Sequence, residues 1–183
     1  MNRAFFYITL FCINITLLFS SYNNNNIISD YESIYKQSLQ LIQNDQINQS
    51  IVLLEDITAH YKNNANQINI NAHYDLGNIY LSRLSNYKLA AFHFEFIYKT
   101  LKYNYSKNEK DTGIKLKSLY ELKLKSLFML GYIYHNHLGN FSKAQDYYNI
   151  FLKHYKDTDL ASSVVYELKI IEEEIKKFNL INK

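Results

Sequence analysis

One stretch near the C-terminus decides the fold: LGYIYHNHLGNFSKAQDYYNIFLKHYKDT, residues 130–158. Large and small apolar residues recur in its second half at steps of three, four, three and four: Phe141, Ala144, Tyr148, Phe151 and Tyr155. This spacing places the side chains along one face of an α-helix. The stretch therefore predicts an amphipathic helix whose second core position is small.

The same spacing occurs twice more, upstream of this stretch. The nearer copy is Tyr87, Ala90, Phe94, Ile97 and Leu101. The farther copy is Ile47, Ser50, Leu54, Ile57 and Tyr61. The second position is small each time, and a small side chain allows a neighbouring helix to approach closely. The chain therefore contains an internal repeat built on helices.

A second helical pattern precedes each of the last two stripes. The separation from Gly77 to Ala90 equals that from Gly131 to Ala144, at 13 residues. Asn86 and Asn140 stand immediately before the stripes, where a helix start needs a capping side chain. Two helices joined by a short turn pack as antiparallel neighbours, so each pair predicts a helical hairpin. The first unit is degenerate, because Ser38 stands where the later units have glycine.

These units resemble the tetratricopeptide repeat, whose signature places Leu-Gly and Tyr on one helix and an aromatic residue, Ala and a large aromatic residue on the next. The matching positions here are Leu76, Gly77, Tyr80, Tyr87, Ala90, Phe94, Leu130, Gly131, Tyr134, Phe141, Ala144 and Tyr148. Lys102 and Lys156 replace the proline that usually closes a unit. The resemblance implies an all-α fold, an α-solenoid of about three such hairpins plus a C-terminal capping helix.

The amino-acid composition also favours a helical fold, with the repeats in one domain. The 183 residues include no proline and only four glycines, too little turn punctuation for a β-sandwich or barrel. The sequence predicts a leader at residues 1–21 and a polar spacer at residues 22–29. One repeat domain follows at residues 30–178. It contains three repeat units, at about 30–63, 66–102 and 115–157, and a final helix at 159–178.

The leader combines one basic residue, Arg3, with a charge-free apolar run from Ala4 to Ser20. Such a segment is typical of a secretory signal peptide, and an uncleaved membrane anchor also fits it. Both alternatives place the repeats in an extracytoplasmic, periplasmic location. The repeat pattern is most similar to bacterial envelope repeat proteins: outer-membrane-assembly lipoproteins of the BamD type, the Tol-system periplasmic protein, and proteins that attend the secretion channel.

No catalytic or metal-binding constellation is evident in the sequence. His135 and His137 are two residues apart, so on a helix they point in different directions and cannot hold one metal ion. The other histidines, His60, His73, His93 and His154, have no partner at a meaningful spacing. We therefore expect no enzyme activity, no cofactor and no metal site. The formal charge of +3 is too mild and too dispersed to indicate a nucleic-acid partner.

The resemblance implies instead that the chain binds other proteins, such as envelope assembly, secretion or division machinery. Its inner groove would be lined by residues of the first helix of units two and three: Tyr74, Asn78, Leu81, Ser82, Phe128, Tyr132, His135 and Asn136. An alternative function uses the lysine-rich insertion, residues 102–125, to contact anionic lipid or an acidic partner. A solvated loop and the outer face of a long helix is the favoured explanation of those lysines, because runs of charge usually form solvated faces.

Overall fold

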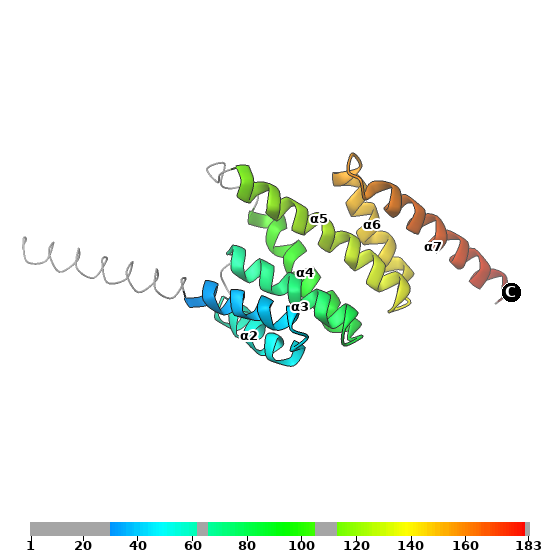
Figure 1. The fold of residues 1–183 in the computed structure, drawn as a ribbon. Helices are drawn as coiled ribbons and strands as arrows, with labels where there is room; N and C mark the ends of the chain where they lie inside the picture. The colour runs from blue at the N-terminus through cyan, green and yellow to red at the C-terminus, as the bar shows by residue number, and fades with distance from the viewer. Residues whose placement is uncertain (1–29, 62–65, 105–112, 182–183) are drawn as a thin grey trace, which may run out of the picture. The chain divides into compact units, whose positions relative to one another are not determined.

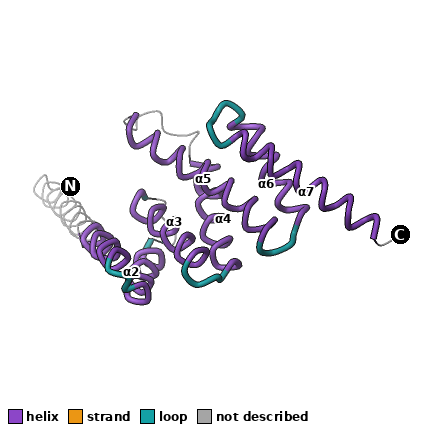
Figure 2. Tube along the Cα trace, turned by 45° about the vertical axis from the view of Figure 1, so that its right-hand side comes forward, coloured by secondary structure: helices purple, strands orange, loops and turns teal. Residues whose placement is uncertain are grey.

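The computed structural model describes residues 30–61, 66–104 and 113–181. Within these three ranges every regular element is an α-helix and no strand occurs, as Figure 2 shows. The predicted all-α class is therefore confirmed. The leader, residues 1–21, and the spacer, residues 22–29, lie outside the described residues.

The chain divides into two compact units, Met1–Ile57 and Thr58–Lys183, and the boundary falls inside one helix. The described part of the first unit contains a helix over residues 30–43 and the beginning of α2, Ile47–His60. Between these two helices, Asp45 has a positive φ of 58°. Ser50, the small residue of the first stripe, is fully buried.

Among the described residues, the second unit contains the end of α2 and then five whole helices in chain order. They are α3 Gln67–Ser82, α4 Tyr87–Asn104, α5 Gly113–Asn136, α6 Phe141–Tyr155 and α7 Ala161–Ile181. Each helix packs on the next one in sequence, and α5 also contacts both α3 and α7 (Figure 1). The helices thus form the hairpins α3–α4 and α5–α6, followed by α7 as the final helix.

The turns of the two hairpins have the same pattern of backbone hydrogen bonds. The backbone N–H of Asn86 donates to the carbonyl of Tyr80 at 2.8 Å, and that of Asn140 donates to Tyr134 at 2.8 Å. The Asn140 side chain accepts a hydrogen bond from the Lys143 backbone N–H at 3.0 Å. The Asn86 side chain likewise faces the Leu89 N–H, at a longer 3.3 Å. The predicted helix caps at both asparagines are confirmed.

A left-handed residue precedes each cap and marks the repeat. Ser85 has φ of 51° and Gly139 has φ of 60°. Asp45 occupies the equivalent place between the first two helices, so the three left-handed positions are spaced 40 and then 54 residues apart, as are the predicted units. The repeat is thus visible in the backbone as well as in the sequence.

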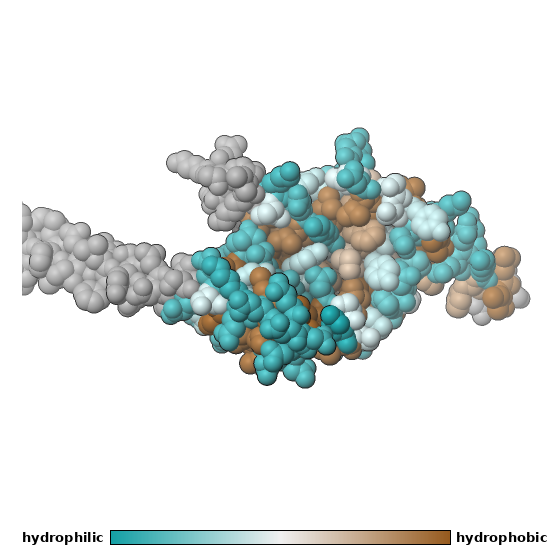
Figure 3. All heavy atoms as spheres, in the orientation of Figure 1, coloured by the Kyte–Doolittle hydropathy of each residue, from teal (hydrophilic) through white to brown (hydrophobic). Residues whose placement is uncertain are grey.

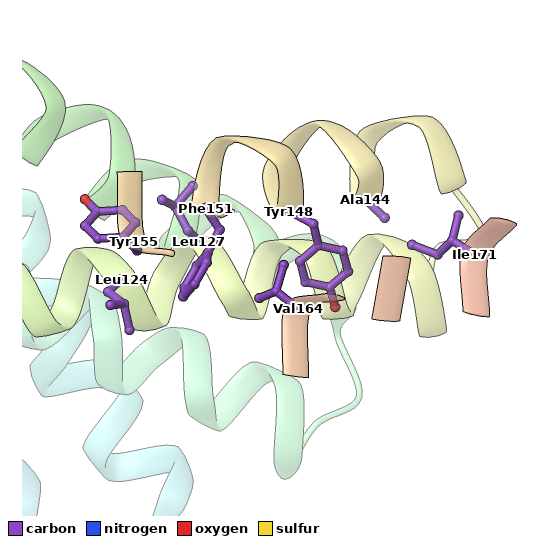
Figure 4. Close-up of a cluster of buried hydrophobic side chains, with 8 residues drawn as sticks. All are labelled: Leu124, Leu127, Ala144, Tyr148, Phe151, Tyr155, Val164 and Ile171. Carbon is purple, nitrogen blue, oxygen red and sulfur yellow. The ribbon is translucent and has the colours of Figure 1, made fainter. Parts of the chain in front are cut away.

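The core of the last hairpin is closed by α7. Figure 4 shows Leu124 and Leu127 of α5, Ala144, Tyr148, Phe151 and Tyr155 of α6, and Val164 and Ile171 of α7 in one buried cluster. Tyr148 and Val164 lie close together in this view. Since Ser50, Ala90 and Ala144 are all fully buried, the small second position of each stripe has the packing role predicted for it.

Two glycines let an aromatic ring of the next helix lie directly on the backbone. A Cβ atom at Gly131 would stand 2.3 Å from the Tyr148 ring, and one at Gly77 would stand 2.9 Å from the Phe94 ring. Tyr148 and Phe94 are both fully buried, so neither ring has free space in which to retreat. The glycine of the Leu-Gly pair is therefore required by close packing, more strongly at residue 131.

We expect Gly131→Ala to lower the free energy of unfolding by about 1–3 kcal/mol. Alanine stabilises a helix by roughly 1 kcal/mol relative to glycine, but the cost of overpacking against Tyr148 is larger than this gain. Gly77→Ala is the matched control, and its milder overlap should leave it at least about 1 kcal/mol more stable than Gly131→Ala. Urea unfolding followed by circular dichroism measures both. Equal losses in the two variants would contradict this account of the packing.

Candidate groove surface

The eight predicted groove residues occupy four equivalent positions on α3 and α5, 54 residues apart. The pairs are Tyr74 with Phe128, Asn78 with Tyr132, Leu81 with His135, and Ser82 with Asn136. Both helices belong to the second compact unit and contact each other. The structure therefore brings the two predicted sets onto neighbouring first helices of successive hairpins.

On α3, these residues keep part of their surface open to solvent. Tyr74, Asn78 and Leu81 are half-buried, and Ser82 is exposed. The Tyr74 ring meets the Phe94 ring edge-on, with centroids 5.8 Å apart. The Ser82 hydroxyl donates to the Asn78 carbonyl at 2.7 Å. An aromatic ring and an amide side chain are thus presented together on this helix.

On α5, three of the four residues repeat this arrangement. Phe128 is half-buried and tilts against Tyr148, with centroids 6.1 Å apart. Tyr132 is half-buried and meets His137 edge-on at 5.3 Å. Asn136 is exposed, and its Nδ2 donates to the Tyr132 carbonyl at 3.2 Å, as Ser82 does to Asn78. The two helices thus present matched polar and aromatic surfaces.

His135 differs from the other seven, because α7 covers it. It is 6% exposed, and its Nδ1 and Nε2 each lie 3.0 Å from a carboxylate oxygen, of Glu167 and Glu174 respectively. Its placement on an open groove surface is therefore corrected: His135 joins α5 to α7. The Glu174 side chain is 44% exposed and still takes part in this contact. The seven-residue spacing of the two glutamates on one helix face is the only sequence signal that could have suggested the bridge.

His73 and His93 form a second contact that the sequence analysis missed. Their Nδ1 atoms lie 2.9 Å apart in the core between α3 and α4, and both residues are buried. His73 stacks on Phe96 at 3.7 Å, and His93 stacks on Tyr80 at 5.6 Å. The prediction that these histidines have no partner is therefore wrong.

Burial sets the charge state of this pair. It lowers the pKa of His73 to about 3, with a further contribution from His93, and lowers the pKa of His93 to about 4. Both rings are therefore neutral near pH 7, so one Nδ1–H can donate to the other Nδ1. The pair is a buried structural hydrogen bond between α3 and α4.

A shallow hollow lies elsewhere, between α4 and the turn that joins α5 to α6. Its lining residues are Lys88, Ala91, Phe92, Glu95, Tyr134, Leu138 and Asn140. The Glu95 carboxylate accepts hydrogen bonds from the hydroxyls of Tyr134 at 3.0 Å and Tyr147 at 2.8 Å, and pairs with Lys99 at 2.7 Å. Burial alone would raise the pKa of Glu95, but these bonds more than offset it and leave that pKa lowered. The network ties α4 to α5 and α6.

Across residues 30–61, 66–104 and 113–181, no group of three or more His, Cys, Asp or Glu side chains is placed to hold a metal ion. In the same part of the chain, no helix combines the length and apolar character needed to cross a membrane.

Comparison with known proteins identifies one repeat unit directly. Residues 125–158 match the tetratricopeptide repeat family model. This segment covers the second half of α5, all of α6 and the turn between them, including Gly131, Ala144 and Tyr148. A search of curated proteins found no match to the chain. The match and the consecutive helical hairpins support a tetratricopeptide-type helical solenoid, an architecture that generally mediates protein–protein interaction.

Proposed function

We propose that this protein is a non-enzymatic scaffold of the bacterial cell envelope that binds a segment of a partner protein along α3 and α5. The observation that carries the proposal is the pair of matched surfaces on these helices, in a chain whose residues 125–158 match a tetratricopeptide repeat. Tyr74 and Asn78 on α3, and Tyr132 and Asn136 on α5, offer aromatic area and amide hydrogen bonds to an extended or helical peptide.

Rigidity supports this role. In each hairpin a fully buried aromatic ring packs on the backbone of the other helix: Phe94 on Gly77, and Tyr148 on Gly131. This packing holds the two surfaces in place in the unbound protein. A preformed surface loses little conformational entropy on binding, and more of the contact energy remains as affinity. The extracytoplasmic location is part of the same proposal and rests on the leader alone, residues 1–21.

The lipid-binding alternative receives less support from the helices. In the described part of the lysine-rich segment, Lys117 and Lys125 are exposed on α5, but Glu121 is exposed between them. Opposite charges four residues apart on a helix pair with each other and weaken attraction to an anionic surface. We therefore favour a protein partner, and treat lipid binding as an outcome that the experiment can reveal.

The test is chemical crosslinking of the full-length chain in membranes, followed by purification and mass spectrometry of captured proteins. We expect a specific partner whose recovery falls about tenfold or more in Tyr74→Ala/Tyr132→Ala, because truncating anchoring aromatic residues commonly costs 2 kcal/mol or more. Phe92→Ala is the matched control, since Phe92 is an exposed aromatic residue on α4.

Two results would count against the proposal. Equal recovery from the wild type and the double variant, with both folded by circular dichroism, would exclude these residues as the docking surface. Capture of no protein above background, with salt-sensitive binding to anionic vesicles that disappears when residues 102–125 lose their lysines, would establish the lipid function instead.

A further inference from the structure

The groove face of α3 and α5 is polar along most of its length. Two residues one turn apart on each helix carry hydrogen-bonding side chains, and we call these four the polar row: Asn78 and Ser82 on α3, and Tyr132 and Asn136 on α5. Tyr74 and Phe128 place one aromatic ring beside this row on each helix. Towards the start of the helices the face continues with further polar residues: Asn71 and Gln67 on α3, and Lys125 and Glu121 on α5.

Several polar groups of this face are not used within the described part of the chain. There, the side chain of Asn78 makes no hydrogen bond, and neither do the hydroxyl groups of Tyr74 and Tyr132. The Nδ2 of Asn136 donates to the Tyr132 carbonyl at 3.2 Å, which leaves its Oδ1 as an open acceptor. A segment that docks here removes water from these groups, so it must supply hydrogen bonds in return.

An extended segment can supply those hydrogen bonds, whereas a helix cannot. The backbone N–H and C=O groups of an extended chain are unpaired, but a helix pairs them within itself. A helix docks through a stripe of apolar side chains, which would leave the Asn78 amide and the Tyr132 hydroxyl with neither water nor a partner. The most exposed large apolar side chains among the described residues, Leu180 at 74% and Ile181 at 83%, lie instead at the C-terminal end of α7, where Figure 3 shows apolar atoms gathered.

The spacing of the two helices also suits an extended chain. In Figure 1, α3 and α5 run in the same direction, and they contact each other. Packed helices lie about 8–10 Å apart, a distance that about three residues of extended chain span. A segment that crosses both helices along the polar row therefore meets the equivalent residues Asn78 and Tyr132 with backbone groups about three residues apart. Side chains on one edge of that segment reach Tyr74 and Phe128.

We propose that the partner protein enters the groove as an extended segment, held through its backbone by the polar row and through its apolar side chains by Tyr74 and Phe128. This inference rests on the proposed function and narrows it to one class of binding segment. The Asn78 amide donates to a backbone carbonyl of the segment and accepts from a backbone N–H. The Oδ1 of Asn136 accepts from another backbone N–H, so recognition depends on the shape of the segment as well as on its side chains.

The test replaces the two amides by apolar side chains of similar size. The full-length variant Asn78→Leu/Asn136→Leu is crosslinked in membranes and purified, and the captured partner is quantified by mass spectrometry. We expect recovery of the partner to fall about tenfold or more, because backbone groups of the segment lose their hydrogen bonds. Asn149→Leu is the matched control, since Asn149 is an exposed asparagine on α6, and its recovery should equal that of the wild type. Leucine favours a helix more than asparagine does, so both variants should keep the fold, which circular dichroism checks.

The opposite result identifies a helical partner. Recovery from Asn78→Leu/Asn136→Leu that equals or exceeds that of the wild type would overturn the extended segment, because an apolar helix gains contact area from the two leucines. If Tyr74→Ala/Tyr132→Ala still loses the partner in that experiment, the proposed function stands and only the inference about the segment fails. If neither double variant loses the partner, the docking surface itself is wrong, and the inference falls with it.

Discussion

Tyr148→Ala is expected to lower the free energy of unfolding by about 3–5 kcal/mol, the usual cost of removing a large aromatic side chain from a core. Tyr148 is fully buried where α5, α6 and α7 meet, and its ring covers the backbone at Gly131. Its removal would open a cavity between three helices at once, which limits how far the surrounding side chains can close it. Urea unfolding of the full-length chain, followed by far-ultraviolet circular dichroism, measures the change.

Tyr148→Phe is the control that separates the ring from its hydroxyl. Among the described residues the Tyr148 hydroxyl is buried and meets no hydrogen-bond partner, and burial, with a contribution from Glu167, raises its pKa. A buried hydroxyl without a partner contributes no stability. Tyr148→Phe should therefore remain within about 1 kcal/mol of the wild type or exceed it. A loss as large as that of Tyr148→Ala would show that the hydroxyl, and not ring packing, stabilises this junction.

The second large effect is acid destabilisation through His73 and His93. Both rings stay neutral in the fold, with pKa values of about 3 and about 4, whereas an unfolded histidine takes up a proton near pH 6.5. The unfolded chain therefore binds more protons as the pH falls below about 6.5, and stability decreases from there towards the folded pKa values. Between pH 7 and pH 5 the pair should cost about 2–4 kcal/mol, since each pH unit contributes up to about 1.4 kcal/mol for each ring.

The variant His73→Phe/His93→Phe isolates this effect. It removes both titrating groups and leaves aromatic rings against Phe96 and Tyr80, the present stacking partners. The quantity to compare is the difference in unfolding free energy between pH 7 and pH 5 within each protein. That difference should shrink by about 2–4 kcal/mol in the variant. An unchanged acid dependence would mean that other groups take up the protons.

The hairpins were predictable because their signals are local. The stripe from Phe141 to Tyr155, the small residue Ala144 and the cap at Asn140 are all set within one helix and its turn, and the structure places each as predicted. Gly131 and Tyr148, both positions of the repeat signature, meet within the same hairpin. Helical periodicity identifies which face of a helix is buried, and it was sufficient for these features.

The contacts between helices were not predictable in the same way. His73 and His93 are 20 residues apart and meet because of the register of α3 on α4, which no periodicity within one helix reports. His135 was placed on an open groove because the pattern of α5 says nothing of the path of α7, whose Glu167 and Glu174 meet its ring. The hydrogen bonds of Glu95 depend likewise on three helices, because Tyr134 of α5 and Tyr147 of α6 donate to this carboxylate of α4.

The most direct test of the central claim, that α3 and α5 together bind a protein partner, is site-specific photocrosslinking in membranes. A photoreactive phenylalanine analogue replaces Tyr74 or Tyr132 in the full-length chain, and Phe92 on α4 in the control. We expect both groove positions to label the same protein, which mass spectrometry then identifies, and position 92 not to label it. Labelling of that protein from position 92 alone, or of no protein from either groove position, would contradict it.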